Sequence, residues 1–269
     1  MGLLIVRLLT LLNTEDSHST VFHVAETLVE HYDQIADLSI GDMAMLANVS
    51  KSTMSKFARK IGFDDYYDLK DSAPFVEDRF NNRLNYLTNI VDTLEKNELD
   101  EYFSAIQEDI DTLRQSIDKA AIDRLAQALV RYHKVAAFGL LFSESAALDF
   151  QYKLAYNGKF IFTCQEDLKQ EQYVREAGED TLIIVFTNSG NYVQQNQLLP
   201  GWPKKNSFRH SRAHIFAVTA NPELAKLSYI EDTIVFPHRT SIQTHAFLYQ
   251  IIMDLIVARY RHFALKNGN

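Results

Sequence analysis

Cysteine is almost absent from this sequence, since Cys164 is the only one among 269 residues. A single cysteine excludes an intramolecular disulfide framework and a zinc site built from several cysteines, and it fits a reducing compartment such as the cytoplasm. We interpret Cys164 as a small buried apolar residue rather than as a nucleophile. Long apolar runs are missing too. Residues 1–12 are apolar, but Arg7 interrupts them and no small-residue cleavage site follows, so we expect neither a signal peptide nor a membrane span.

An excess of positive charge is also missing, because the formal net charge at pH 7 is -8. This balance argues against a protein that coats nucleic acid with its whole surface. Any contact with DNA must come from a local basic patch. The share of apolar residues, 46%, is large enough to fill the cores of one large domain or two ordinary ones.

Two kinds of hydrophobic pattern divide the chain. Up to Leu69 the apolar residues follow the helical period, and Ala73-Pro74 then breaks the pattern, because proline cannot continue a helix interior. We predict an all-α domain over 1–74 and a helical linker over 75–118. From 119 to 269 short β-branched and aromatic runs alternate with helical stretches, which predicts a parallel sheet covered by helices on both faces. The runs are 135–138, 160–163, 181–186, 214–218 and 233–236, and a last helix spans about 243–264.

A helix-turn-helix is predicted at 39–62. Ser39 and Ser50 are suitable N-caps for two short helices separated by Asn48-Val49, and Gly62 ends the second. The second helix buries its apolar face and carries four cations and no acid on the rest, which suits the major groove of DNA. We expect Ser50, Lys51, Ser52, Thr53, Ser55 and Lys56 to meet bases or adjacent phosphates, and Arg59 and Lys60 to meet phosphates. The alternative is a solvated basic face on an ordinary helical bundle.

The segment 38–70 resembles the helix-turn-helix of RpiR-type regulators. The resemblance rests on Ser39-Ile40-Gly41-Asp42, on Val49-Ser50-Lys51-Ser52-Thr53, on the run 57–63 and on the continuation 66–70. It implies a three-helix core of winged-helix or homeodomain type in which 51–61 is the recognition helix.

Two loops that follow predicted strands carry small polar residues. In an open parallel sheet, ligands bind outside the carboxyl ends of the strands, where amides at helix N-termini attract anions. The first loop covers 139–145 and the second 187–191. The candidates for holding a phosphate are Gly139, Ser143, Ser145, Thr187, Asn188, Ser189 and Gly190.

Both loops resemble those of the sugar-isomerase (SIS) domain that RpiR-type regulators carry, which read Gly-x-Gly-x-Ser and Ser-x-Ser-Gly-x-Thr. The resemblance implies a three-layer α/β/α fold that binds a phosphorylated sugar. Leu141 stands where the family has its second glycine, and Tyr192 where it has the closing threonine. Phe142 and Ser143 take the places of the loop serines, Thr187 replaces a serine, and His245-Ala246 lies where the family has an arginine.

Three functions remain open. The first is a cytoplasmic transcription regulator of carbohydrate metabolism, a homodimer or homotetramer that binds a double-stranded operator and responds to a phosphorylated sugar. The second is a regulator whose C-terminal domain is only a dimerisation module. The third is a sugar-phosphate isomerase, for which Glu144 or His245 would be the base. We predict the first, with no catalytic residue, metal site, cofactor or membrane contact.

Overall fold

A computed structural model describes residues 3–73, 94–95, 99–140, 142–194, 207–237 and 245–267. The chain divides into two compact units, which the described residues represent by 3–73 and by those from 94 onward. Within these ranges no helix is long and apolar enough to cross a membrane. The predicted boundary at 74 and residues 75–93 and 96–98 of the predicted linker 75–118 lie outside the described residues, so the domain boundaries stay predictions.

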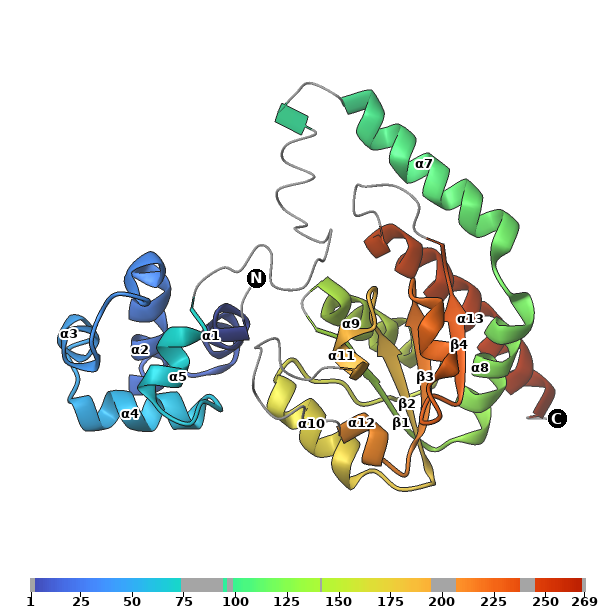
Figure 1. The fold of residues 1–269 in the computed structure, drawn as a ribbon. Helices are drawn as coiled ribbons and strands as arrows, with labels where there is room; N and C mark the ends of the chain where they lie inside the picture. Colours follow the sequence, from blue (N-terminus) through green and yellow to red (C-terminus); the bar gives the residue numbers. More distant parts are fainter. Residues whose placement is uncertain are drawn as a thin grey trace. The chain divides into compact units, whose positions relative to one another are not determined.

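The N-terminal unit is entirely helical, as the hydrophobic period predicts (Figure 1). Its elements are α1 (Leu3–Thr14), α2 (Thr20–Glu30), the 3-10 helix η1 (Tyr32–Gln34), α3 (Ile40–Leu46), α4 (Lys51–Lys60) and α5 (Tyr66–Asp71). One apolar core joins them, in which Leu8, Leu28, Met43 and Met54 are fully buried. Burial of this kind outweighs the modest propensity of helices as short as α3.

The C-terminal unit alternates helices and strands. It contains α7 (Leu99–Ser116), α8 (Lys119–Arg131), β1 (Lys134–Phe138), α9 (Phe142–Ala155), α10 (Asp167–Glu176), β2 (Thr181–Phe186), α11 (Asn191–Gln194), α12 (Ser207–His210), β3 (His214–Thr219), η2 (Pro222–Lys226), β4 (Asp232–Val235) and α13 (His245–Asn267). The four strands pair in parallel in the order β1-β2-β3-β4. The all-α unit and the parallel sheet confirm the predicted fold class.

Helices cover both faces of the sheet (Figure 1). Along β2, Leu182, Ile184 and Phe186 pack against the side of α8, α9 and α13, whereas Ile183 and Val185 face the side of α10, α12 and η2. Every residue of β2 is therefore buried, as expected for a central strand of a three-layer domain.

The prediction of a strand at 160–163 was wrong. Only Phe162 pairs with the sheet, through one parallel bridge to Ala136. A continued parallel ladder would next use Cys164 O, but Gln170 Nε2 donates to this carbonyl at 2.7 Å. A side-chain amide takes the place of the next ladder bond here, so the segment has one bridge and no strand.

Candidate DNA-binding and ligand-binding sites

Helices α3 and α4 form the predicted helix-turn-helix. Ser39 Oγ accepts from the Asp42 amide and the Asp42 carboxylate accepts from the Ser39 amide, both at 3.3 Å, which makes a capping box at the start of α3. Ser50 Oγ accepts from the Thr53 amide at 3.0 Å and so caps α4. Asn48 in the turn has φ +48°, a left-handed conformation that asparagine tolerates better than most residues.

Helix α4 turns its apolar side into the core and its polar side to solvent. Met54, Phe57 and Ala58 are buried. Seven of the eight predicted DNA contacts are exposed or border solvent without an ion pair to an acid among the described residues: Ser50, Lys51, Ser52, Thr53, Ser55, Lys56 and Arg59. The structure therefore gathers the predicted residues on one open face, as major-groove docking requires.

Two of the four cations on α4 lie next to acids. Lys60 Nζ forms an ion pair with Glu15 Oε1 at 2.8 Å. Lys51 lies beside Asp42, where hydrogen bonds from Ser39 and the charge of Lys51 lower the pKa of the carboxyl group. Lys56 is exposed and forms no ion pair within the described residues, so we expect it to be the most available cation for a phosphate.

Arg7 anchors the end of α4, a role that no sequence pattern predicted. The side chain is 9% exposed, its Nη1 donates to Ile61 O at 2.8 Å, and its guanidinium lies 5.0 Å from the ring centre of Phe63. A cation at the carboxyl end of a helix stabilises the helix dipole, and here it also satisfies a terminal carbonyl. The arginine that interrupts the apolar N-terminus therefore positions the predicted recognition helix.

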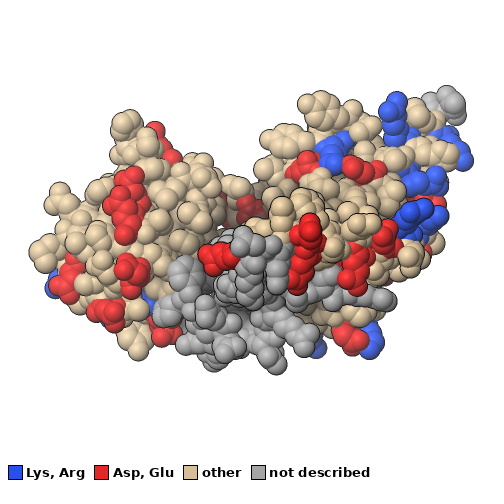
Figure 2. Space-filling view, turned by 90° about the horizontal axis from the view of Figure 1, so that it is seen from above, with Lys and Arg blue, Asp and Glu red and all other residues tan. Residues whose placement is uncertain are grey.

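The rest of the N-terminal unit offers little positive charge to DNA. Figure 2 shows a face on which acidic side chains are spread widely while most visible Lys and Arg gather toward one end. Before residue 74, four of the six Lys and Arg residues belong to α4. The basic face of α4 is the local patch that a net charge of -8 demands.

The two predicted ligand loops follow β1 and β2, which are neighbours in the sheet. Gly139 packs against the start of α9 so closely that an added Cβ would lie 2.4 Å from Ser143 O. Gly190 has φ +84°, and its Cβ would lie 2.9 Å from Leu224 Cδ2. Glycine is thus needed at both places, at the first for space and at the second for space and backbone conformation.

Most loop hydroxyls are used to hold the loops themselves. Thr187 Oγ1 accepts from the Gly190 amide at 3.2 Å, and Ser189 Oγ accepts from the Asn191 amide at 3.3 Å. Ser145 Oγ donates to Phe142 O at 2.8 Å, and the buried Ser143 Oγ lies 3.4 Å from Tyr249 Oη. Asn188 Oδ1 differs, because it is buried and has no hydrogen-bond partner within the described residues.

Tyr192 stands where the family motif has a threonine, and the structure gives it another function. Its hydroxyl donates to Gln170 Oε1, while Gln170 Nε2 donates to Gly139 O at 3.1 Å. Gln170 is fully buried, and burial raises the pKa of Tyr192 well above its usual value, so the phenol remains a donor. The chain of bonds links the first ligand loop to the second. The sequence offered no signal for it, because Gln170 lies in a helix between the two loops.

Two titratable groups near the first loop have shifted pKa values. Burial raises the pKa of Glu144 to about 7. Burial also raises the pKa of the Cys164 thiol to about 11, with Glu166 adding to the shift. The thiol is therefore protonated at neutral pH and a poor nucleophile, as predicted. Leu141 and the side chain of His245 lie outside the described residues.

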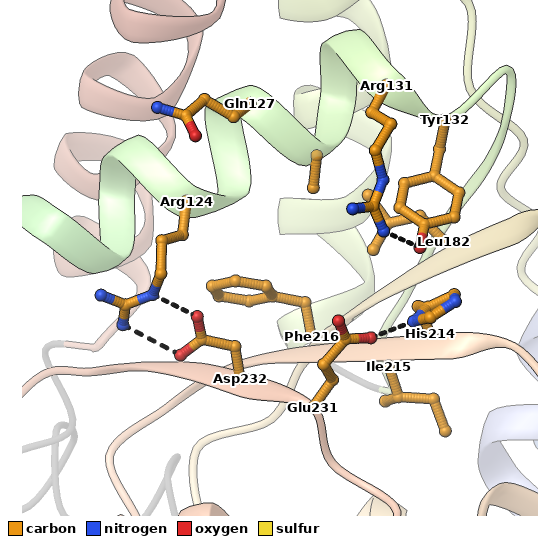
Figure 3. A pocket seen from close by; sticks show the side chains of 11 residues that line it. Arg124, Gln127, Arg131, Tyr132, Leu182, His214, Ile215, Phe216, Glu231 and Asp232 are labelled. Atoms are coloured by element: carbon orange, nitrogen blue, oxygen red, sulfur yellow. Dashed lines mark hydrogen bonds and ion pairs between the residues drawn. The ribbon is translucent and has the colours of Figure 1, made fainter.

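A cavity of about 380 Å³ lies between α8 and the amino ends of β2, β3 and β4 (Figure 3). Arg124 binds Asp232 with Nε–Oδ2 at 2.5 Å, and His214 binds Glu231. Arg131 lies over the ring of Tyr132, with its guanidinium carbon 4.6 Å from the ring centre. None of the predicted ligand residues lines this cavity. It is at the opposite end of the strands from the loops.

Comparison with known proteins identifies the N-terminal unit. The helix-turn-helix domain model of the rpiR family matches residues 8–72. An HTH-type transcriptional regulator in the aarA 3' region of Providencia stuartii is 23% identical over 270 residues, which covers 97% of this chain and 91% of that protein. The HTH-type transcriptional regulator HexR of Escherichia coli is 26% identical over 232 residues, which covers 81% of this chain and 74% of HexR.

Among solved structures, the Vibrio vulnificus NanR protein complexed with ManNAc-6P is 16% identical with a TM-score of 0.48, and the match covers 98% of this chain and 92% of that one. The stronger evidence is the helix-turn-helix match and the transcriptional regulators that align along most of the chain. On this evidence residues 8–72 form a helix-turn-helix domain of the rpiR family, and the chain is a DNA-binding transcriptional regulator.

Proposed function

We propose that this regulator is cytoplasmic and responds to a phosphorylated sugar bound by its C-terminal unit, a SIS-type domain, without acting as an enzyme. In this proposal 1–74 binds the operator, 75–118 connects, and 119–269 senses. DNA contacts come from Ser50, Lys51, Ser52, Thr53, Ser55, Lys56, Arg59 and Lys60. The sugar phosphate is held by Gly139, Ser143, Ser145, Thr187, Asn188, Ser189 and Gly190.

The observation that carries the sensing proposal is the pair of glycine-built loops at the carboxyl ends of β1 and β2. A parallel sheet presents its ligands at this end, and glycine lets a phosphate approach the backbone amides. The unpartnered Asn188 Oδ1 supports it, because a buried acceptor without a partner costs about 1–3 kcal/mol. A sugar hydroxyl that donates to Asn188 would remove this cost.

Regulation requires that the ligand bind one state of the regulator better than another. A single helix-turn-helix binds DNA too weakly to select an operator, so we propose a homodimer or homotetramer that presents two recognition helices to two half-sites. The sugar phosphate would then shift the population between arrangements that differ in operator affinity.

Thermal unfolding tests the sensor. The purified chain is heated with a panel of hexose, pentose and amino-sugar phosphates, and the unphosphorylated sugars are the controls. At a hundredfold excess over its dissociation constant, a ligand adds about 2.7 kcal/mol to the unit that binds it. Asn188→Ala should reduce that gain, whereas Asn157→Ala, in the turn after α9, should not. No shift with any phosphate would favour a pure dimerisation module.

DNA binding is tested with a duplex operator selected from random DNA and followed by fluorescence anisotropy. Lys56→Gln should weaken binding and lower the salt dependence by about one counterion, because it removes one phosphate contact. Lys60→Gln should weaken it less, because Glu15 already holds that ammonium. Equal, negligible effects of both substitutions would contradict the assignment of α4 as recognition helix.

One observation favours a second function. The pKa of Glu144 is near 7, which suits a general base in an aldose–ketose isomerisation. Interconversion of any sugar phosphate from the panel, abolished by Glu144→Gln with ligand binding intact, would establish the enzyme. Binding without turnover would establish the sensor.

A further inference from the structure

The cavity between α8 and the amino ends of β2, β3 and β4 has no part in the proposed binding of DNA or sugar phosphate (Figure 3). Its volume of about 380 Å³ lies within the range of about 300–1,000 Å³ that is usual for small-molecule sites. All of its lining residues belong to the C-terminal unit. The cavity is therefore large enough for a second ligand, and its side chains decide which kind.

The cavity has an apolar floor and charged walls. Leu182 of β2 and Phe216 of β3 are 2% and 4% exposed and belong to the core on the α8 side of the sheet. Two arginines of α8 and two acids at the amino end of β4 provide the charges of the walls: Arg124, Arg131, Glu231 and Asp232. Figure 3 shows Phe216 between the charged groups of the two walls. A ligand in the cavity would thus meet both charge and apolar surface.

Three of the four charged groups already have a partner in the walls. Arg124 donates to Asp232 through Nε and Nη2, with Nη2 at 3.0 Å from Oδ1, and these bonds raise the pKa of Arg124. Glu231 forms a hydrogen bond with Nδ1 of His214. Arg131 forms no ion pair with an acid in the part of the chain that the structure describes. Its positive charge is the one that the walls leave without a counterion.

A neutral side chain holds Arg131 in position instead. Arg131 Nη2 donates to Tyr132 Oη, and the guanidinium carbon lies 4.6 Å from the centre of that ring. Tyr132 is only 7% exposed and also contacts His214, with 5.0 Å between the ring centres, so it is a firm support. A guanidinium has five N–H donors, and the phenol takes one of them. The others are preorganised for a planar acceptor such as a carboxylate.

The charge balance of the cavity favours a ligand with one negative charge. A phosphate dianion would bring its second charge close to Glu231 and Asp232, and opposing like charges weakens binding. A cation would meet Arg131, whose charge has no counterion. A single carboxylate needs only the charge that Arg131 offers. The buried floor of Leu182 and Phe216 then favours an acid with an apolar body.

We propose that this cavity binds a small monocarboxylate with an apolar body. The carboxylate accepts hydrogen bonds from Arg131, and the body packs on Leu182 and Phe216. The site lies at the opposite end of the strands from the loops proposed for the sugar phosphate, so it adds a second ligand to the proposed sensor. Its test uses the full chain without DNA or sugar phosphate, so either proposal can fail while the other stands.

Isothermal titration calorimetry of the full chain with 4-methylpentanoate and 3-phenylpropionate tests the proposal. We expect a dissociation constant of about one millimolar or less, which is ordinary for ligands of this size. The matching amides keep the shape without the charge and should bind at least about tenfold more weakly. Leucine and phenylalanine form a second series. Tighter binding of the amino acids would identify an amino acid whose ammonium group meets Glu231, and the reverse order would identify a simple acid; both support the site.

Three variants locate the bound acid. Arg131→Gln, at an exposed position, should raise the dissociation constant at least about tenfold, the effect of losing a charge-assisted hydrogen bond. Ala128→Leu should also weaken binding, because it narrows the cavity without changing a charge. The matched control is Arg175→Gln, since Arg175 is an exposed arginine of α10, outside the cavity, and should leave the affinity unchanged.

Thermal unfolding followed by circular dichroism verifies that each variant is folded. The proposal is overturned if neither acid binds at millimolar concentrations. It is also overturned if the amides bind as well as the acids, or if folded Arg131→Gln binds the acids as tightly as the unaltered chain does.

Discussion

Replacing Tyr192 by phenylalanine should destabilise the C-terminal unit by about 2 kcal/mol, although it removes only one oxygen atom. The ring lies 5.2 Å from that of Phe208 at an interplanar angle of 81°, and phenylalanine preserves this edge contact. What disappears is the donor to Gln170 Oε1. Gln170 is fully buried, so its carbonyl oxygen would lose its partner without gaining water.

A buried acceptor left unsatisfied costs about 1–3 kcal/mol, whereas a hydrogen bond exchanged for one with water costs much less. In a unit of this size, one kcal/mol lowers the melting temperature by about 2–4 °C. The expected loss is therefore roughly 4–8 °C. Because Gln170 also holds Gly139 O, we expect the first ligand loop to loosen and sugar-phosphate affinity to fall as well.

Differential scanning calorimetry measures the change, and Tyr173→Phe is the control. That ring stacks on Phe162 with 5.0 Å between the ring centres, and its hydroxyl makes no hydrogen bond within the described residues, so we expect a change below about 0.5 kcal/mol. If Tyr192→Phe unfolded at the same temperature as the unaltered chain, the hydrogen bond would carry no net energy. The proposed link between the loops would then be refuted.

Three further predictions follow from particular contacts. Burial raises the pKa of Glu144 from 4.5 to about 7, so the stability that this group contributes is fully present below pH 4.5 and is lost as the pH rises through 7. Glu144→Gln should therefore raise the free energy of unfolding at pH 8, but not at pH 5, by about 1–2 kcal/mol after allowance for solvent. Equal effects on the melting temperature at both pH values would contradict burial as the cause. Gly139→Ala should lower the free energy of unfolding in denaturant by about 2–3 kcal/mol, because the added Cβ would lie 2.4 Å from the backbone oxygen of Ser143. Gly158→Ala should lower it by only about 1 kcal/mol, because Gly158 has φ +78° but open space around it. Similar losses for the two substitutions would contradict the steric argument. Arg7→Met should lower the stability of the N-terminal unit by about 1–2 kcal/mol in the same assay. The substitution removes the charge-assisted hydrogen bond to Ile61 O, and this loss is partly offset because a buried charge is removed as well. No change in stability would show that the contact of Arg7 with Ile61 is unnecessary.

The sequence predicted the strands that carry unbroken apolar runs. It placed β2 at 181–186, which is its observed span, and β1, β3 and β4 within one residue at each end. In β2 and β3 such runs leave no face for solvent, so their pattern alone predicts strands that are buried on both faces. The caps Ser39 and Ser50 were predictable for a similar reason, because each acts on amides two to three residues away.

Contacts between distant segments were not predictable. The run 160–163 looks like a strand, yet Gln170 takes the carbonyl of Cys164, which a ladder would otherwise use. Arg7 appeared to interrupt an apolar helix, whereas it lies against Ile61 and Phe63, more than fifty residues away. Polar side chains that act over such separations leave no period or spacing in one sequence.

The structure of the two proposed ligand loops bears on the choice between the proposed sensor and the alternative enzyme. Thr187 and Ser189 accept hydrogen bonds from backbone amides of their own loop, and Tyr192 donates to Gln170, which in turn holds the first loop through Gly139 O. Fewer hydroxyls then remain to surround a substrate, which would cost an enzyme the contacts that stabilise a transition state. A regulator needs only a ligand that prefers one of its states, and a site made of backbone amides with Asn188 can supply that difference. Loops held by their own hydroxyls thus favour regulation over catalysis in this chain.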